Sequence, residues 1–476
     1  MNYSVRFVFG LIIFFSLPVN KLLSQNNRVA EQPNIIFIFA DDLGYSDVGC
    51  YGQEKIETPN IDKLAAQGLK FTQFYSGSTV CAPARTTFLT GMHTGHTPVR
   101  GNKSFKPEGQ TPLPASALSF ATVLQQHGYA TAAFGKWGLG YITTTGDPNK
   151  KGFDEFFGYN CQSLAHNYYP DHLWNNHQRI DLPENEKEKT VYSGDLIHQQ
   201  ALEYIKNNKG KPFFLYLPYT APHGEVIVPE DSMLAHYIKK FNEKSVQKER
   251  LYDGRPLGPY PHASFAAMVS RLDKYVGEIV DEVNALGMAD NTLIIFTSDN
   301  GPHREGGGDP DYFDSNGIYR GIKRDLYEGG IRVPFIAYWP GKIKPATTNQ
   351  AGVLWDMFPT FLELAHIKEK YSTDGISLVP TLLRKGKQHQ HEYLYWEFHE
   401  NNGRQAVRWK NWKAVQLAVG SSPQVPLELY DLSVDPSEKN DIASGHPDVV
   451  KKMKKMIKSA HVSNPDWPLL YHEINK

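Results

Sequence analysis

Continuous apolar segments, each the length of one strand and separated by helical patterns, most limit the folds open to this chain of 476 residues. The clearest is N-I-I-F-I-F-A at residues 34–40, and others lie at 130–134, 213–217, 292–297 and 331–338. Strands that are apolar on both faces are typical of parallel sheets covered on both sides by helices. We therefore expect an α/β fold with a large, mixed, mostly parallel sheet sandwiched by helices.

Two helical patterns lie between these strands. Residues 117–126 predict one helix, which His127-Gly128 closes. A longer helix is predicted by apolar residues spaced three and four apart and ends at Gly287. Its apolar positions are Phe265, Met268, Val269, Leu272, Val276, Ile279, Val283 and Leu286.

The composition changes at residues 384–391, R-K-G-K-Q-H-Q-H, which are typical of a linker. After it, short alternating segments predict a small antiparallel sheet, and residues 449–458 predict one helix. The predicted strands are 393–398, 405–409, 412–417 and 427–430. We expect a large α/β domain at 31–385 and a small C-terminal α+β subdomain at 386–476.

The first 25 residues have the pattern of a signal peptide. Arg6 precedes an uncharged run at 7–19, and polar residues follow it. The run is shorter than the roughly 20 residues that span a bilayer, which suits a secretory segment. Cleavage is expected near residues 24–27. We expect an exported protein, periplasmic or secreted, with no stable membrane insertion.

Charge and cysteine content exclude other classes. The formal net charge is -1, so no global field attracts nucleic acid. The only cysteines are Cys50, Cys81 and Cys161, which is too few for a disulfide scaffold. Cys50 and Cys161 pair or stay free; the sequence leaves both open.

Polar residues follow the predicted strands at the point where each strand ends. In a parallel sheet these ends lie at one edge, where ligands bind. We therefore expect the polar groups to meet in one cleft. They are Asp41 and Asp42, Lys136, His223, and Asp299 and Asn300, with Lys323 shortly before the fifth strand.

Asp41, Asp42, Asp299 and Asn300 are oxygen ligands with no histidine among them. Such a set suits Ca²⁺ or Mg²⁺ rather than zinc. The neutral Asn300 and the number of ligands favour Ca²⁺, with Mg²⁺ second. An Asp-Asp pair alone is more often a turn or a helix cap, but two pairs after buried strands favour the metal.

The segment C-A-P-A-R at 81–85 predicts a helix that begins near a cysteine. Pro83 suits a first helical turn, so Cys81 lies where backbone N–H groups favour an anion. Arg85 follows one turn later on the same face. The competing interpretation is a cysteine that is only a buried small apolar residue.

A sulfate or phosphate group is the ligand that this set of charges favours. Lys136, Lys323 and Arg85 would add three positive charges to the cleft. His223 is the candidate acid or base. Taken singly, such lysines and histidines are more often surface or capping residues.

In its motifs and their order, the chain resembles the type I, formylglycine-dependent sulfatases of the alkaline-phosphatase-like superfamily. The resemblance covers nearly the whole chain after the first 25 residues. The matching motifs are N-I-I-F-I-F-A-D-D-L-G-Y from residue 34, C-x-P-x-R at 81–85 with T-G at 90–91, G-K-W at 135–137, S-D-N-G at 298–301 and Y-E-G-G-I-R-V-P at 327–334.

The resemblance implies that a formylglycine-generating maturation enzyme oxidises Cys81 to an aldehyde, whose hydrate would attack sulfur. It implies a Ca²⁺ ion held by Asp41, Asp42, Asp299, Asn300 and residue 81 itself. Arg85, Lys136 and Lys323 would hold the sulfate and the hydrate. His223 would protonate the leaving alcohol.

One position departs from the family pattern. Many sulfatases have G-K-W-H-L-G, whereas this chain has Gly138 in place of the histidine. His166 is the first candidate for a replacement base, and His303 is the second. A loop histidine with no catalytic role is the competing interpretation for both.

The resemblance implies a sulfuric ester hydrolase of arylsulfatase type that acts on a sulfated carbohydrate, with aryl sulfates as surrogates. The aromatic segment at 168–174 is a candidate sugar platform, with core packing as the alternative. Two other functions remain open. One is a phosphonate monoester or phosphodiester hydrolase of the same superfamily, and the other is an inert glycan-binding relative.

Overall fold

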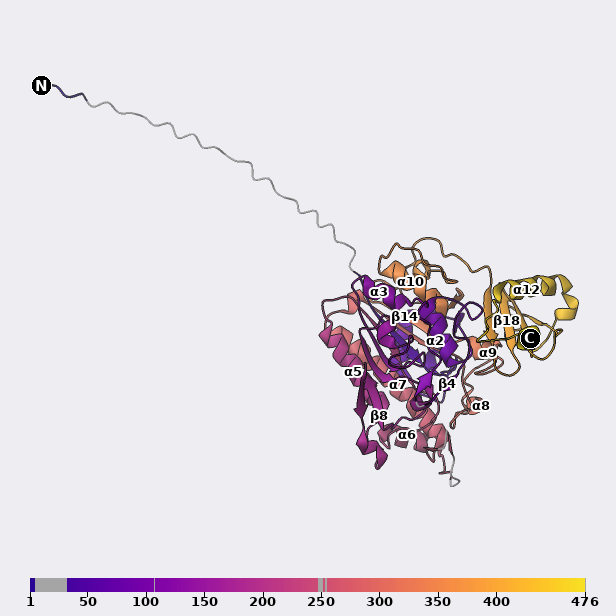
Figure 1. Ribbon diagram of the computed structural model, residues 1–476. Helices are drawn as coiled ribbons and strands as arrows, with labels where there is room; N and C mark the ends of the chain where they lie inside the picture. The colour runs from indigo at the N-terminus through magenta and orange to yellow at the C-terminus, as the bar shows by residue number, and fades with distance from the viewer. Residues whose placement is uncertain (5–31, 107, 247–250, 253–254, 476) are drawn as a thin grey trace. The chain divides into compact units, whose positions relative to one another are not determined.

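The sheet that the sequence predicts is present and has ten strands in the order β15-β2-β14-β13-β1-β10-β6-β7-β8-β9. The computed structural model describes residues 1–4, 32–106, 108–246, 251–252 and 255–475 (Figure 1). The five central strands, from β13 to β7, are parallel, and antiparallel pairs flank them on both sides. The strands, in sheet order, are Ala346–Thr348, Leu69–Phe71, Phe335–Tyr338, Thr292–Ser298, Asn34–Ala40, Phe213–Pro218, Ala130–Lys136, Glu155–Tyr159, His172–Asn175 and Gln178–Asp181.

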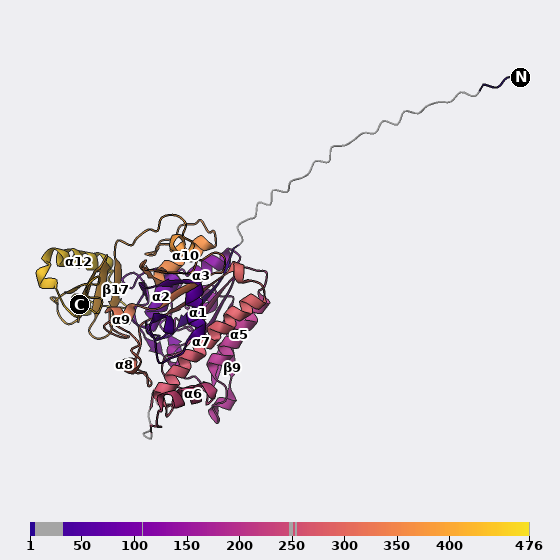
Figure 2. The same cartoon turned by 180° about the vertical axis from the view of Figure 1, so that it is seen from behind.

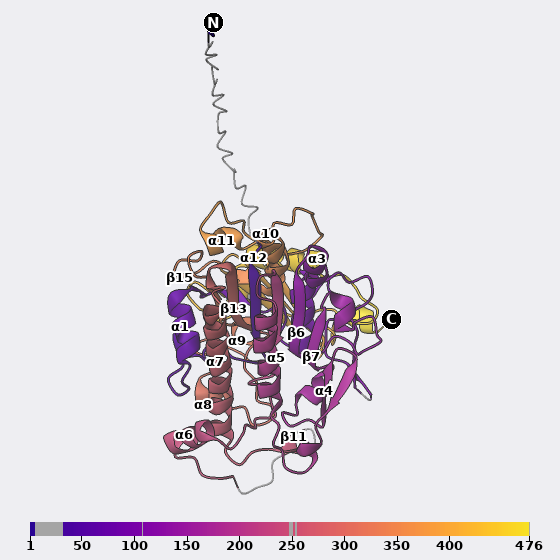
Figure 3. The ribbon, with the colours of Figure 1, turned by 90° about the vertical axis from the view of Figure 1, so that its left-hand side faces the viewer.

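Helices cover both faces of this sheet because both faces of its central strands are apolar. Ile36 and Ile38 of β1 pack toward one core, whereas Ile35, Phe37 and Phe39 pack toward the other. The first core contains α1 (Pro59–Gln67), α5 (Ser193–Asn207) and α7 (Pro261–Ala285); the second contains α2 (Cys81–Thr90), α3 (Phe120–Gln126) and α10 (Met357–Leu364). Figure 3 shows α5 and α7 lying along one face.

The C-terminal region forms the predicted second sheet. Strands β17 (Leu394–Phe398), β18 (Arg404–Trp409), β19 (Trp412–Leu417) and β20 (Glu428–Asp431) are antiparallel in this order. Helix α12 (Pro447–Ala460) packs on one face through Met453, Met456 and Ile457 (Figure 2). The other face packs against residues near the start of α2 and before β14, so the small sheet is anchored to the region that carries the polar strand ends.

Shorter elements fill the connections. They are β3 Phe74–Tyr75, β4 Ser104–Phe105, β5 Gly109–Gln110, β11 Leu251–Tyr252, β12 Arg255–Pro256, β16 Gly352–Val353, α4 Gln162–Ala165, α6 Ser232–Phe241, α8 Pro310–Phe313, α9 Glu328–Ile331, α11 Val379–Leu383 and α13 Tyr471–Ile474, with short 3-10 turns at Gly49–Tyr51, Pro148–Lys151, Pro183–Glu186, Ala289–Asn291, Leu354–Asp356 and Ala443–Gly445.

Two predicted boundaries are wrong. The helix expected from residue 117 begins at Phe120, because Ser119 caps it by accepting a hydrogen bond from the Ala121 N–H. The strand expected from residue 331 begins at Phe335, since Glu328–Ile331 forms the short helix α9. The predicted signal peptide falls almost entirely on residues 5–31, which lie outside the described residues. Within the described chain, none of the helices has the length and apolar character required to cross a bilayer.

Candidate active site

Parallel strands of the main sheet end at one edge and bring polar side chains together. Asp41 and Asp42 follow β1, and Asp299 and Asn300 follow the neighbouring β13. The Asp42 backbone N–H donates to Asp299 Oδ1 at 2.9 Å, and Asn300 Nδ2 donates to Asp42 Oδ1 at 2.6 Å. Lys136 ends β6, on the far side of β10 from β1. The sheet topology therefore assembles these residues from three distant parts of the sequence.

Helix α2 adds Cys81 as its first residue. The Cys81 thiol lies 3.2 Å from Asp41 Oδ1 and 3.9 Å from Asp42 Oδ1, and its side chain is almost completely buried. Burial, and then the Asp41 charge, raise the pKa of this thiol well above its usual range. The unmodified thiol is therefore neutral at physiological pH and is a weak nucleophile.

Arg85 lies one helical turn after Cys81 and faces the same cluster. Its Nη2 lies 3.1 Å from Asp299 Oδ2 and 3.4 Å from Asp41 Oδ1, and its Nη1 donates to the Lys136 carbonyl at 2.8 Å. Its Nε has no hydrogen-bond partner among the described residues. The guanidinium thus fixes two of the carboxylates and keeps one donor unused.

Two buried lysines neutralise the other carboxylate oxygens. Lys136 Nζ donates to Asp41 Oδ2 at 2.6 Å and approaches Cys81 Sγ at 3.5 Å. Lys323 Nζ donates to Asp42 Oδ2 at 2.8 Å. Burial is the largest influence and alone would lower the pKa of each lysine, but the neighbouring negative groups, Asp41 or Asp42 first among them, together outweigh it and raise the pKa. Both ammonium groups are therefore charged inside the site.

His223 completes the group that we call the Cys81 cluster. Its Nδ1 bonds to the Gly224 carbonyl and must carry the proton, so the lone pair of Nε2 faces the cluster. That Nε2 lies 3.0 Å from Lys323 Nζ and 3.2 Å from Asp42 Oδ2. Burial, and then the Lys323 charge, lower the pKa of His223. The cluster comprises Asp41, Asp42, Cys81, Arg85, Lys136, His223, Asp299, Asn300 and Lys323.

The two candidate replacement bases lie on opposite sides of the His223 ring. His166 stacks on it at 4.6 Å between ring centroids, and His303 stacks at 5.4 Å. His303 Nδ1 accepts from the Glu305 N–H, and its Nε2 bonds to the Pro222 carbonyl. Because both of its nitrogens bond to the backbone, His303 supports His223 and is a poor candidate base. His166 stays the stronger candidate.

The oxygen ligands fit a hard divalent cation. Asp41, Asp42, Cys81 and Asp299 present ligand atoms within 4.8 Å of one another. Asn300 Oδ1 is buried and has no hydrogen-bond partner among the described residues. Burial, and then the Asp41 charge, raise the pKa of Asp299 well above its usual range. An ionised Asp299 is thus unfavourable without a further positive charge, which a cation would supply.

Glu305 contacts the cluster but was not among the residues predicted from the sequence. Its Oε2 lies 3.0 Å from Lys323 Nζ and 3.3 Å from His223 Nε2, and its other oxygen pairs with Arg324. The signal was its position five residues after Asn300, in the same loop beyond β13. A list of candidate residues extended along this loop would have included Glu305.

The aromatic segment proposed as a sugar platform belongs to the core. Tyr168 is 1 % exposed, and its hydroxyl donates to the Thr220 and His223 carbonyls at 2.7 Å and 2.9 Å. Leu173 is fully buried, and Trp174 is nearly so. The interpretation as a platform is therefore wrong, because these side chains are buried, and Tyr168 holds the His223 loop in place.

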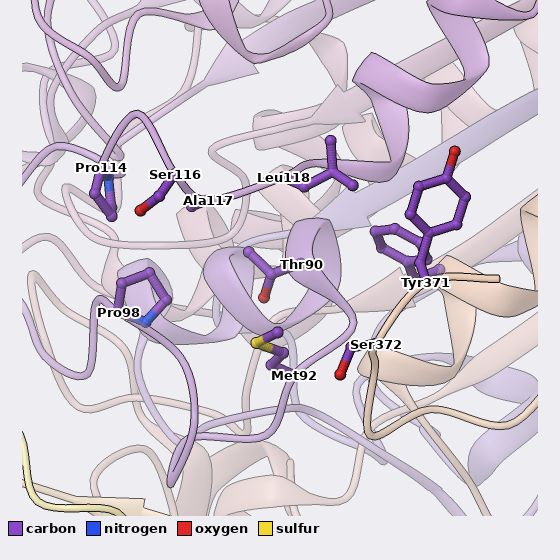
Figure 4. Close-up of a pocket in the computed structure, with 10 residues that line it drawn as sticks. Thr90, Met92, Pro98, Pro114, Ser116, Ala117, Leu118, Tyr371 and Ser372 are labelled. Carbon is purple, nitrogen blue, oxygen red and sulfur yellow. The ribbon is translucent and has the colours of Figure 1, made fainter. Parts of the chain in front are cut away.

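A cavity of about 360 Å³ lies at the opposite end of α2 from Cys81 (Figure 4). Thr90 and Met92 line it together with Leu118, Phe358 and Tyr371. None of its lining residues is charged. This cavity does not suit an anionic group, so the chemistry lies at the N-terminal end of α2.

Comparison with known families identifies two matching sequence models. Residues 33–367 match the model described as "Sulfatase". Residues 316–463 match the model described as "N-sulphoglucosamine sulphohydrolase, C-terminal". Together the two matches cover the main sheet and the C-terminal sheet.

Individual proteins are similar to this chain over most of their length. An N-acetylgalactosamine-6-O-sulfatase of Bacteroides thetaiotaomicron is 29% identical, with 92% of this chain and 95% of that protein covered. Human arylsulfatase A is 32% identical, with 91% and 89% covered. The crystal structure of Ps i-CgsB in complex with k-i-k-neocarrahexaose has a TM-score of 0.77 at 29% identity, with 94% and 96% covered.

Proposed function

Because the chain belongs to the sulfatase family and is a sulfuric ester hydrolase, we propose that its substrate is a sulfated carbohydrate. The single observation that carries this proposal is the likeness to Ps i-CgsB, whose structure was solved with an oligosaccharide and which is covered almost completely. The similar N-acetylgalactosamine-6-O-sulfatase supports the same substrate class. Aryl sulfates are expected to act as surrogate substrates.

We propose that the sulfate ester binds against the Cys81 cluster. Lys136, Lys323 and Arg85 supply buried positive charge on several sides of Cys81, which suits the oxygens of a sulfate group. Charge that builds on these oxygens during reaction would be stabilised by donors that are already in place. Water is largely excluded, since every member of the cluster is buried.

Residue 81 is proposed as the nucleophile in its formylglycine form, because the neutral buried thiol is unsuited to that role. One oxygen of the hydrated aldehyde would attack sulfur as the bond between sulfur and the ester oxygen breaks. The second hydroxyl would then lose its proton and expel sulfate, which restores the aldehyde for hydration by water. Cys81 is 1 % exposed in the folded chain. A maturation enzyme would therefore have to act before the chain folds.

Asp41, Asp42, Asp299 and Asn300 are the proposed ligands of a Ca²⁺ ion, with Mg²⁺ less favoured. Such an ion would lower the proton affinity of an oxygen on residue 81 and offset the carboxylate charges. Arg85 keeps Asp299 and Asp41 oriented for this role, because its Nη2 contacts both carboxylates.

His223 is the proposed acid for the leaving alcohol. Its Nδ1 proton is fixed by the Gly224 carbonyl, so a proton gained at Nε2 points into the cluster. The Asp42 carboxylate at 3.2 Å from Nε2 stabilises that protonated state, and the ring can then pass the proton to the ester oxygen. Overall, one water cleaves one ester to an alcohol and sulfate.

The test compares esters on the matured protein. We expect hydrolysis of 4-nitrophenyl sulfate well above that of 4-nitrophenyl phosphate, and release of sulfate from sulfated galactose and N-acetylgalactosamine units. Preference for phosphate or phosphonate esters would contradict the proposed substrate class. Binding of sulfated sugars without any hydrolysis would support an inert glycan-binding protein instead.

A further inference from the structure

Gln162 is a buried glutamine that packs against the turn after Lys136 and has an unused hydrogen-bond donor. Its side chain is 6% exposed, and its Nε2 has no hydrogen-bond partner among the described residues. Buried amide groups in folded proteins nearly always have a partner. An unpaired buried donor next to a binding site therefore points to a ligand that completes it.

The side chain of Gln162 fills the space beside Gly138. A Cβ added to Gly138 would lie 3.0 Å from Gln162 Cγ and 3.1 Å from Gln162 Nε2. Gly138 follows Lys136 by two residues, and its N–H donates to the Asn160 carbonyl, which holds this turn against the loop that carries Gln162. Gln162 thus occupies a position that a side chain at residue 138 would otherwise take.

The short helix α4 links Gln162 to a residue that contacts the cluster. His166 lies four residues later, so the two side chains share one face of that turn. The His166 ring stacks on His223 at 4.6 Å with an angle of 11° between the planes. The same face of α4 therefore contacts His223 through His166, and it contacts the turn after Lys136 through Gln162.

We propose that Gln162 is a substrate-binding residue whose Nε2 donates a hydrogen bond to an oxygen of the bound sulfate group. This inference rests on the proposed sulfate site and adds one contact to it. Sulfate oxygens only accept hydrogen bonds, and the unused group of Gln162 is a donor, so the two match. A carboxamide does not titrate near neutral pH, so this contact is independent of pH and Gln162 is not a base.

The test uses inorganic sulfate as the probe, measured as an inhibitor of 4-nitrophenyl sulfate hydrolysis by the matured full-length protein. Gln162→Met keeps the size of the side chain and removes the donor. A hydrogen bond to a charged group corresponds to about a tenfold or larger effect. We expect the Ki of sulfate to rise by at least that factor, with an unchanged or higher melting temperature because an unpaired polar group is removed. Gln162→Glu should weaken the binding of sulfate further, because the two negative charges repel each other.

The matched control is Ser163→Ala, an exposed neighbour on the same helix, which should leave both values unchanged. An unchanged Ki in Gln162→Met, with wild-type hydrolysis intact, overturns this inference and leaves the proposed function standing. A wild-type protein that neither hydrolyses sulfate esters nor binds sulfate overturns both. A lower melting temperature with an unchanged Ki assigns Gln162 a packing role and also overturns the inference.

Discussion

Two buried groups of charges differ in how completely the protein satisfies them. The first is the Cys81 cluster. The second, which we call the Glu397 cluster, joins the C-terminal sheet to the segment after α2 and comprises Glu397, Arg100, His399, His461 and Tyr395. Both are buried, and both combine carboxylates with cationic groups.

In the Glu397 cluster every charge has internal partners. Oε1 of Glu397 accepts from Arg100 at 2.8 Å and from His399 at 3.0 Å, and Oε2 contacts His461 at 2.8 Å and Tyr395 at 2.9 Å. Burial alone would raise the pKa of Glu397, but these hydrogen bonds and the Arg100 charge hold it well below its usual range. This cluster stabilises the fold and leaves nothing for a ligand.

In the Cys81 cluster the internal partners do not suffice. Among the described residues, Asn300 Oδ1 and Arg85 Nε have none, and the pKa of Asp299 is raised. The difference teaches that burial and charge alone do not mark a functional site. In the Cys81 cluster the unpaired polar atoms lie among several buried charges of both signs, and a charged ligand would complete that combination.

The largest expected effect concerns the Cys81 cluster and its proposed nucleophile. Cys81→Ala should lower kcat/KM for 4-nitrophenyl sulfate by at least about a thousandfold, because the nucleophile is removed. Stability should change little, since the thiol is neutral and small. Cys50→Ala, at a half-buried cysteine outside the cluster, is the control and should keep full activity. Activity retained in Cys81→Ala would remove the basis for placing the chemistry there.

The next effect tests the saturated cluster. Glu397→Gln should lower the free energy of unfolding by about 3 kcal/mol, because it leaves the buried Arg100 without its counter-charge. Urea denaturation at pH 7 measures the change, and activity per folded molecule should be unchanged. Glu400→Gln, at a more exposed carboxylate three residues later, should cost less than about 1 kcal/mol. Equal losses in the two variants would contradict the contrast between the clusters.

Much of the main sheet could be predicted from the sequence because its central strands are apolar on both faces. The segment at 34–40 corresponds to β1, Asn34–Ala40, without error. The outer strands β2, β15, β8 and β9 were missed, since segments of three or four residues carry no clear periodicity. The central strand β7, Glu155–Tyr159, was missed as well, because it has only five residues and Gly158 interrupts its apolar run. Ile331 was assigned to a strand because an apolar run does not distinguish a helical turn from extended chain.

The same logic applies to the site. Residues that directly follow a strand, such as Asp41 and Asp299, were predictable because sheet topology alone brings strand ends together. Glu305 and Gln162 were not, since their positions depend on how long loops fold back over the sheet. Which polar atoms stay unpaired depends on every neighbour in three dimensions and has no signature in a single sequence.

A third prediction compares how the two clusters respond to loss of one carboxylate, with and without a bound cation. Asp299→Asn should change the stability of the cation-free protein by less than about 1 kcal/mol, unlike Glu397→Gln, because burial already disfavours the ionised Asp299. Ca²⁺ at a hundredfold its dissociation constant should stabilise the wild type by about 2.7 kcal/mol, measured by thermal unfolding, and Asp299→Asn should lose this gain.

The control variant for the Ca²⁺ stabilisation experiment is Asp374→Asn. Asp374 forms a separate group with His93 and His96 that also places ligand atoms close together. If Ca²⁺ binds the Cys81 cluster, its stabilising effect should persist in Asp374→Asn. Loss of the effect in that variant, with retention in Asp299→Asn, would move the cation to the histidine group and break the proposed ligand set.

The smallest effect concerns pH and the Glu397 cluster. The pKa of Glu397 is lowered by folding, so its contribution is present above its unfolded pKa of about 4.3 and is lost as pH falls below that value. Burial is the largest influence and alone would lower the pKa of His461, but Glu397 and then Glu473 together outweigh it and raise the pKa. The contribution of His461 is therefore full below about 6.5 and is lost as pH rises through the raised value.

The stability difference between wild type and Glu397→Gln should accordingly be greatest between about pH 4.3 and 6.5 and should shrink on both sides. We expect a decline of about 1 kcal/mol toward pH 4, and a similar one at alkaline pH, which urea denaturation across this range can resolve. The Glu400→Gln difference should stay flat. A flat profile for Glu397→Gln would mean that its histidine partners are neutral in the folded protein. The Glu397 cluster would then be held by hydrogen bonds and Arg100 alone, and its contrast with the Cys81 cluster would be one of unpaired atoms rather than of balanced charge.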